Sequence, residues 1–129
     1  VYAEGSAAAY LSCQLELSSG RRIPIAGLIP TIARHNPAAP PPAPAEITVE
    51  NDCWLASKGD NLRGYKNQSW RLEPLALINS LAREPAHRFD IVRSANVIAS
   101  NVHLNLAGQP QTLGRFLSTP VPAVHASRL

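Results

Sequence analysis

Apolar and polar side chains alternate along the first part of the chain. Over residues 10–17 every second position is apolar, which predicts a half-buried strand with the inward-facing residues Leu11, Cys13, Leu15 and Leu17. A turn-forming segment, residues 18–21, comes next, and Ile23 and Ile25 resume the alternation as the second strand of a hairpin. Because Pro24 has no N–H to donate, we expect this second strand at a sheet edge.

Further short apolar segments predict strands along the rest of the chain. They lie at residues 46–50, 89–92, 97–98, 102–106 and 113–117, and residues 70–72 form either another short strand or the lead into a helix. One segment has helical spacing instead. It follows Pro74, a residue suited to the first helical position, and its apolar positions are Leu75, Leu77, Ile78, Leu81 and Ala82. We therefore predict one short helix, which ends before Pro85.

Residues 37–45 interrupt this pattern with a run of proline and alanine. Such a segment lacks the donors for a helix or a central strand and favours an extended polyproline conformation. Two interpretations stay open: an exposed semi-rigid connector, or a ligand for an aromatic groove on another protein.

The patterns together predict a mainly β fold, with α+β at the margin. We expect a small antiparallel sheet, sandwich or barrel of about six or seven short strands with one short helix and a Pro-rich loop. Residues 1–117 are expected to form a single β-rich domain, with the Pro-rich loop at 37–45. Residues 118–129 hold two prolines and little apolar periodicity, which predicts a loose C-terminal tail.

Composition excludes several classes of protein. Among 129 residues, no apolar run reaches the roughly 18 residues of a membrane-spanning helix. The formal net charge is +3, and its basic residues are scattered, whereas nucleic-acid binders concentrate them on one face. We therefore expect neither a membrane span nor a nucleic-acid partner.

Two cysteines, Cys13 and Cys53, form neither a CxxC motif nor a metal-ligand spacing. The sequence begins at Val1 and holds no methionine, which suggests a processed start. We therefore expect a Cys13–Cys53 disulfide and a location that is secreted, periplasmic or at the cell surface. The alternative is a cytosolic domain with two buried thiols. Residues 67–69 also form a glycosylation sequon, which adds little weight.

No catalytic or cofactor motif stands out. The four histidines have no metal-ligand spacing, no GxSxG motif occurs, and the loop at residues 59–64 lacks the ending of a phosphate-binding loop. His103 falls on the polar side of a predicted strand, where a plain surface imidazole is the expected role. We predict no cofactor and no metal, and an enzyme is the minority interpretation.

One stretch has the composition of a recognition surface, since aromatic rings there alternate with charged and amide side chains. The candidate partner-binding residues are Trp54, Lys58, Asp60, Arg63, Tyr65, Lys66 and Trp70. The competing interpretation is that both tryptophans belong to the core.

These observations favour a secreted or periplasmic binding domain without catalysis, which recognises a protein or a glycan, as in virulence or cell-surface interaction. The first alternative is a structural subunit of a larger extracellular or envelope assembly. The second is a hydrolase whose His, Ser and acidic residues meet only in space.

Overall fold

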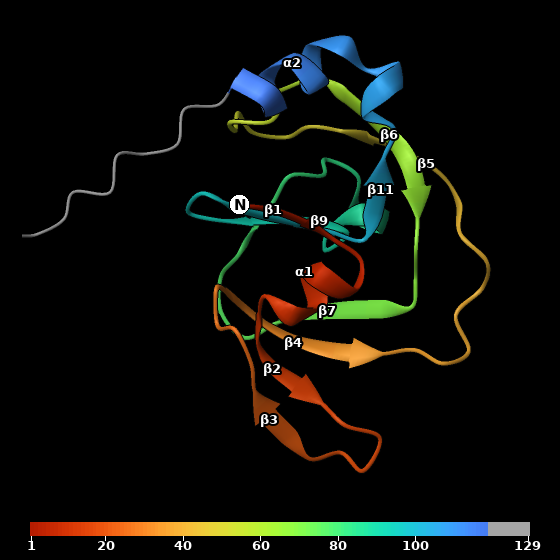
Figure 1. Cartoon of the computed structure of the whole chain (residues 1–129), viewed down its shortest axis with the longest axis vertical. Coiled ribbons are helices and arrows are strands. Elements are labelled where there is room, and N and C mark those ends of the chain that lie inside the picture. Colours follow the sequence, from red (N-terminus) through yellow and green to blue (C-terminus); the bar gives the residue numbers. More distant parts are fainter. Residues whose placement is uncertain (119–129) are drawn as a thin grey trace, which may run out of the picture.

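A computed structural model describes residues 1–118 of the chain (Figure 1). Within these residues eleven strands form three small sheets, joined by two α-helices and two short 3₁₀ turns. Most strand pairs are antiparallel, so the predicted mainly β architecture is confirmed.

The first sheet has the strand order β3-β2-β4-β7. Its strands are β2 (Ser12–Glu16), β3 (Arg22–Pro24), β4 (Ile29–His35) and β7 (Trp70–Pro74). The predicted hairpin is present as β2 and β3, and β3 lies at the edge, as the lack of an N–H on Pro24 requires. The predicted inward face is not the buried one, since Ser12 is fully buried, with its hydroxyl paired to that of Thr31 at 2.8 Å. The residues predicted to face inward are only half-buried: Leu11, Cys13, Leu15 and Leu17.

The second sheet has the order β1-β10-β9-β8. It consists of β1 (Tyr2–Glu4), β8 (Asn79–Ser80), β9 (Ile91–Ser94) and β10 (Val97–Ser100). Its first strand runs parallel to β10. Helix α1 (Ser6–Tyr10) follows β1 and packs against strands of this sheet and of the first one (Figure 1).

The third sheet, in the order β11-β6-β5, is antiparallel throughout. Its strands are β5 (Ala43–Thr48), β6 (Asn61–Lys66) and β11 (Val102–Leu104). The end of the Pro-rich segment belongs to this sheet, so the predicted loop at residues 37–45 is too long. Pro44 fits because β5 is an edge strand.

Two buried clusters hold the sheets together. The larger one contains Ile47 and Val49, which both face inward as their alternation predicts. The second cluster is rich in alanine, with Ala3, Ala8, Ala9, Ala33 and Ala99. Small side chains let α1 lie close to the strands on both sides of it.

The predicted helix after Pro74 is wrong. That segment is extended and contains the short strand β8, and the side chain of Leu77 is fully exposed. Its leucines do not share one buried face. A helix in this segment would therefore have no core surface against which to pack its apolar side. The described helices are instead α1 and α2 (Pro110–Ser118), and α2 replaces the strand predicted at residues 113–117.

The predicted disulfide is also wrong. Cys13 and Cys53 are free thiols that do not lie near each other. Cys13 belongs to β2 of the first sheet, whereas Cys53 follows β5 and packs against the larger buried cluster.

Ser118 ends α2, and the rest of the predicted tail, residues 119–129, lies outside the described residues. No helix among residues 1–118 has the length and apolar character needed to cross a membrane.

Candidate functional site

A sharp turn connects β1 directly to α1 and has an unusual backbone conformation. Gly5, the residue at this turn, has φ 57° and ψ −124°, which residues with a side chain rarely adopt. Its N–H donates to the carbonyl of Ser100 at 2.9 Å, and its own carbonyl accepts from Ala9 at 3.0 Å. A strained strand-to-helix turn of this kind presents the nucleophile in α/β-hydrolases. We call it the β1–α1 elbow (Glu4, Gly5 and Ser6).

The imidazole of His103 lies against this elbow. A Cβ atom placed on Gly5 would lie 3.3 Å from both Cε1 and Nε2 of the ring. On the other side of the ring, Nδ1 lies 3.2 Å from Oε2 of Glu4. The Glu4 carboxylate therefore lies beside Nδ1, while Nε2 faces Gly5. The ring is therefore oriented as a general base would be.

Glu4 is itself held in place by two further donors. Its Oε1 accepts from the hydroxyl of Tyr2 at 2.5 Å and from the backbone N–H of Leu104 at 2.9 Å. Burial, reinforced by the hydrogen bond to Glu4, raises the pKa of Tyr2 well above its usual value. Tyr2 therefore stays protonated and remains a donor to the carboxylate over the whole physiological range.

The elbow contains a base and its orienting acid but lacks a side chain at the position they serve. The neighbouring Ser6 hydroxyl accepts a hydrogen bond from the indole N–H of Trp70 at 3.1 Å. This bond directs Ser6 toward the first sheet. The arrangement thus places an imidazole and a carboxylate beside residue 5, which itself offers no nucleophile.

The seven predicted partner-binding residues do not form one surface. Trp54 packs against the larger buried cluster, with its ring centroid 6.2 Å from that of Phe116. Trp70 lies on the first sheet, where its ring is 5.0 Å from that of His35. Trp70 also packs against the second, alanine-rich cluster. The core interpretation therefore fits both tryptophans, which belong to two different clusters.

The charged members of this predicted set are mostly engaged within the chain. Asp60 accepts from the backbone of Ser57 and pairs with Arg115 at 2.7 Å, and these contacts lower its pKa. Lys66 pairs with Asp90 at 2.8 Å. Lys58 lies exposed in the loop before β6. Only one pair of the predicted residues, Arg63 and Tyr65, lies together on an exposed strand face.

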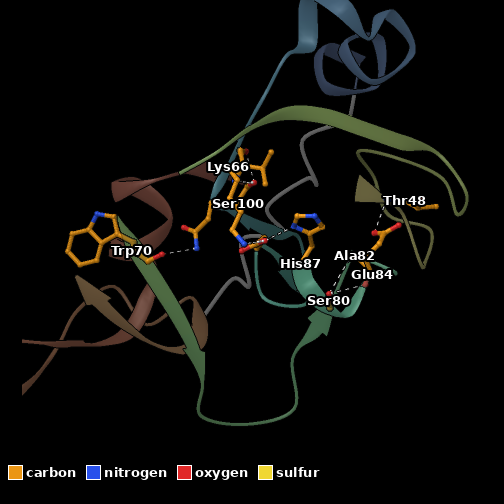
Figure 2. A network of polar contacts seen from close by, with 11 residues as sticks. Thr48, Lys66, Trp70, Ser80, Ala82, Glu84, His87 and Ser100 are labelled. Atoms are coloured by element: carbon orange, nitrogen blue, oxygen red, sulfur yellow. Dashed lines mark hydrogen bonds and ion pairs between the residues drawn. The ribbon is translucent and has the colours of Figure 1, made fainter. Parts of the chain in front are cut away.

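A cavity of about 500 Å³ lies between β7 and the turn η1 (Pro85–His87). Part of its polar lining is paired within the chain: the carboxylate of Asp90 contacts both Lys66 and Nδ1 of His87 at 2.8 Å (Figure 2). Asn101 also lines it and donates to the carbonyl of Trp70. These contacts hold the β6–β7 connection in place. Within residues 1–118, no three His, Cys, Asp or Glu side chains are grouped to hold a metal ion.

Sequence reasoning missed Glu4 and Gly5 and treated His103 as a plain surface residue. A usable signal was present, because a glycine follows a short apolar segment and precedes a run of alanines. That combination is typical of a tight strand-to-helix turn. The approach of His103 could not be predicted, since it depends on how the third sheet docks.

Comparison with known proteins identifies a similar fold but no family and no function. No protein-family model and no curated protein matches the chain. A crystal structure of a glutamine amidotransferase is similar to it, with 19% sequence identity and a TM-score of 0.64. The similarity covers 89% of this chain and 57% of that one, so the chain spans less than two thirds of the amidotransferase. At this identity, what the two proteins share is the fold.

Proposed function

We propose that this chain is a non-catalytic binding domain built on a fold similar to that of a glutamine amidotransferase. The observation that supports this function most strongly is Gly5, which stands at a hydrolase-like elbow directly in front of His103. The oriented base is present, while the residue that it would activate has no side chain.

Acyl transfer through a covalent intermediate needs a nucleophile within reach of a general base. His103 supplies the base, and Glu4 supplies the acidic group that orients it. A glycine offers no oxygen or sulfur to attack a carbonyl carbon. The elbow is therefore suited to holding an amide or a similar polar group by hydrogen bonds, without cleaving it.

The test is the release of ammonia from L-glutamine, chosen because the similar structure is that of a glutamine amidotransferase. The wild-type chain and Gly5→Ala are both expected to release no more ammonia than buffer. Ammonia release by the wild type that disappears in His103→Ala would overturn the proposal. Loss in that variant is decisive only if its unfolding temperature is unchanged, so thermal unfolding is measured in parallel.

The sequence-based hypothesis of a protein or glycan partner fits a non-catalytic domain and stays part of this proposal. Secreted, periplasmic or cell-surface localisation remains a prediction, now without the disulfide as support. Fractionation of cells that express the natural gene with a C-terminal tag tests it. The structural-subunit alternative predicts assemblies larger than one chain, which light scattering measures.

The hydrolase alternative has gained a His–Glu pair but lacks a third member. Ser6, the residue that follows Gly5, carries a hydroxyl, but that hydroxyl accepts a hydrogen bond from the indole N–H of Trp70. The ammonia assay therefore distinguishes the binding function from hydrolysis directly.

A further inference from the structure

Strand register places three side chains in one row across the third sheet. Pro44 on β5 pairs with Tyr65 on β6, and Tyr65 pairs with His103 on β11. Directly paired residues in antiparallel strands project from the same face, with Cβ atoms about 5 Å apart. The row therefore runs from Pro44 through Tyr65 to the imidazole that faces the elbow.

The face around this row is open to solvent. Tyr65 is 56% exposed, and the side chain of Arg63, two residues earlier on the same face of β6, is 68% exposed. A shallow cavity of about 370 Å³ lies over them and is also lined by Pro44, Glu46 and Asn105. We call these five residues the Tyr65 platform.

The backbone beneath the platform is fixed before any ligand arrives. The side-chain amide of Gln109 accepts from the N–H of Arg63 and donates to its carbonyl, both at 2.9 Å. Asn105 donates its own N–H to the same carbonyl at 2.9 Å and caps the turn η2 (Leu106–Gly108). A rigid platform loses little conformational entropy when it binds.

The charges on this face are balanced. Arg63 lies 3.4 Å from Glu46, and His103 lies beside Glu4. A phosphate chain or another strongly anionic ligand would meet a carboxylate next to each basic group. The face instead offers donors and acceptors side by side, which suits a neutral ligand rich in hydroxyl groups.

The exposed ring of Tyr65 provides the apolar contact that such a ligand needs. The face of an aromatic ring carries negative charge density, and the C–H bonds on one side of a sugar ring are weakly positive. A sugar stacked on Tyr65 could direct its hydroxyl groups to Arg63, Glu46 and Asn105. The next sugar unit of the same chain, lying along the row, would reach His103.

We propose that the Tyr65 platform binds a neutral oligosaccharide and places one end of it beside His103. The proposal rests on the non-catalytic binding function, for which it names the ligand class. It uses the strand register and the balanced charges, neither of which depends on the chemistry at Gly5.

The test is isothermal titration of the full chain with cellohexaose, chitohexaose, xylohexaose and maltohexaose. At least one is expected to bind, and Tyr65→Ala should weaken that affinity at least tenfold. Tyr10→Ala is the matched control, because Tyr10 is a tyrosine of similar exposure on α1. It should leave the affinity unchanged.

Two results would overturn the proposal: no binding of any of the four oligosaccharides, or equal effects of the two tyrosine variants on the affinity. The outcome is separable from that of the ammonia assay. Sugar binding lost in Tyr65→Ala, together with glutamine hydrolysis by the wild type, would remove the non-catalytic function and keep the platform. If instead no sugar binds and the wild type does not hydrolyse glutamine, only the proposal for the Tyr65 platform fails.

Discussion

The carboxylate of Glu4 lies 3.2 Å from Nδ1 of His103 and turns the opposite side of the ring toward Gly5. The two residues come from opposite ends of the described chain and from different sheets, β1 in one and β11 in another. This contact between Glu4 and His103 positions the imidazole at the β1–α1 elbow.

Replacement of Gly5 by cysteine should create a reactive thiol. The new Cβ would lie 3.3 Å from the His103 ring, so the imidazole can accept the thiol proton and favour the thiolate. We expect iodoacetamide to modify residue 5 faster than Cys13 or Cys53 near neutral pH, as measured by peptide mass spectrometry over time.

The control for this variant is Gly5→Cys combined with Glu4→Gln or with His103→Asn. Both double variants should lose the rate advantage, because the base is then misoriented or absent. Equal modification rates in the single and double variants would contradict the assigned role of the pair. The strained backbone at residue 5 should cost on the order of 1–3 kcal/mol in Gly5→Cys and Gly5→Ala alike.

Tyr2→Phe should destabilise the chain in a pH-dependent way. At neutral pH the loss of a hydrogen bond to the Glu4 carboxylate should cost about 1.5–3 kcal/mol. Burial raises the pKa of Tyr2 above its ordinary value of 10.0, so the unfolded chain ionises this group first. The stability that Tyr2 contributes is therefore present below pH 10 and lost as the pH rises above it.

Urea unfolding of wild type and Tyr2→Phe at neutral pH and at several values above 10 measures this effect. The difference between the two free energies of unfolding should shrink as the pH rises through that range. A constant difference would mean that Tyr2 ionises equally in both states.

Gly64→Ala should disturb the strand that carries His103. A Cβ at this position would collide with the backbone carbonyl of His103 and approach Cα of Leu104 to 3.0 Å. Since backbone cannot move aside cheaply, we expect a loss of about 2 kcal/mol or more. Thermal and urea unfolding measure it.

Gly114→Ala serves as the comparison for this variant. Gly114 lies in α2 with open space where a Cβ would go, so alanine should stabilise the chain by about 0.5–1 kcal/mol. Similar effects of the two substitutions would argue against the close approach of β6 and β11.

Thiol titration should find two free cysteines per chain. Cys13 and Cys53 are not bonded, so the unfolded, unreduced protein should release two equivalents of thionitrobenzoate from Ellman's reagent. A reductant should leave the unfolding temperature unchanged. Titration of no thiols would restore the disulfide and, with it, the main support for an oxidising compartment.

Local alternation predicted the inward face of β5 correctly but not that of β2, where Ser12 is the buried residue. Ile47 on β5 and Val49 just after it are both fully buried. Spacing alone failed at residues 74–82, where Leu81 instead donates its backbone N–H to Ile91 in a strand-like contact. Apolar residues three and four apart fit a helix, but the pattern does not show whether a partner surface exists.

The candidate site was less predictable than the strands. Tyr65 and Arg63 were predicted from the composition of their stretch, and both lie on the exposed side of β6, but their role in binding stays a prediction. Trp54 and Trp70 were grouped with them only by nearness in sequence. The elbow depends on a contact between β1 and β11, and no local pattern encodes the pairing of such distant segments.

The absent side chain at Gly5 has an evolutionary consequence. Codons for glycine and cysteine can differ by one base, while the base, its acid and the strained turn are already assembled around that position. Where the glycine codon ends in T or C, a single base change would place a thiol at the elbow, so this position can gain or lose a nucleophile while the surrounding scaffold stays the same.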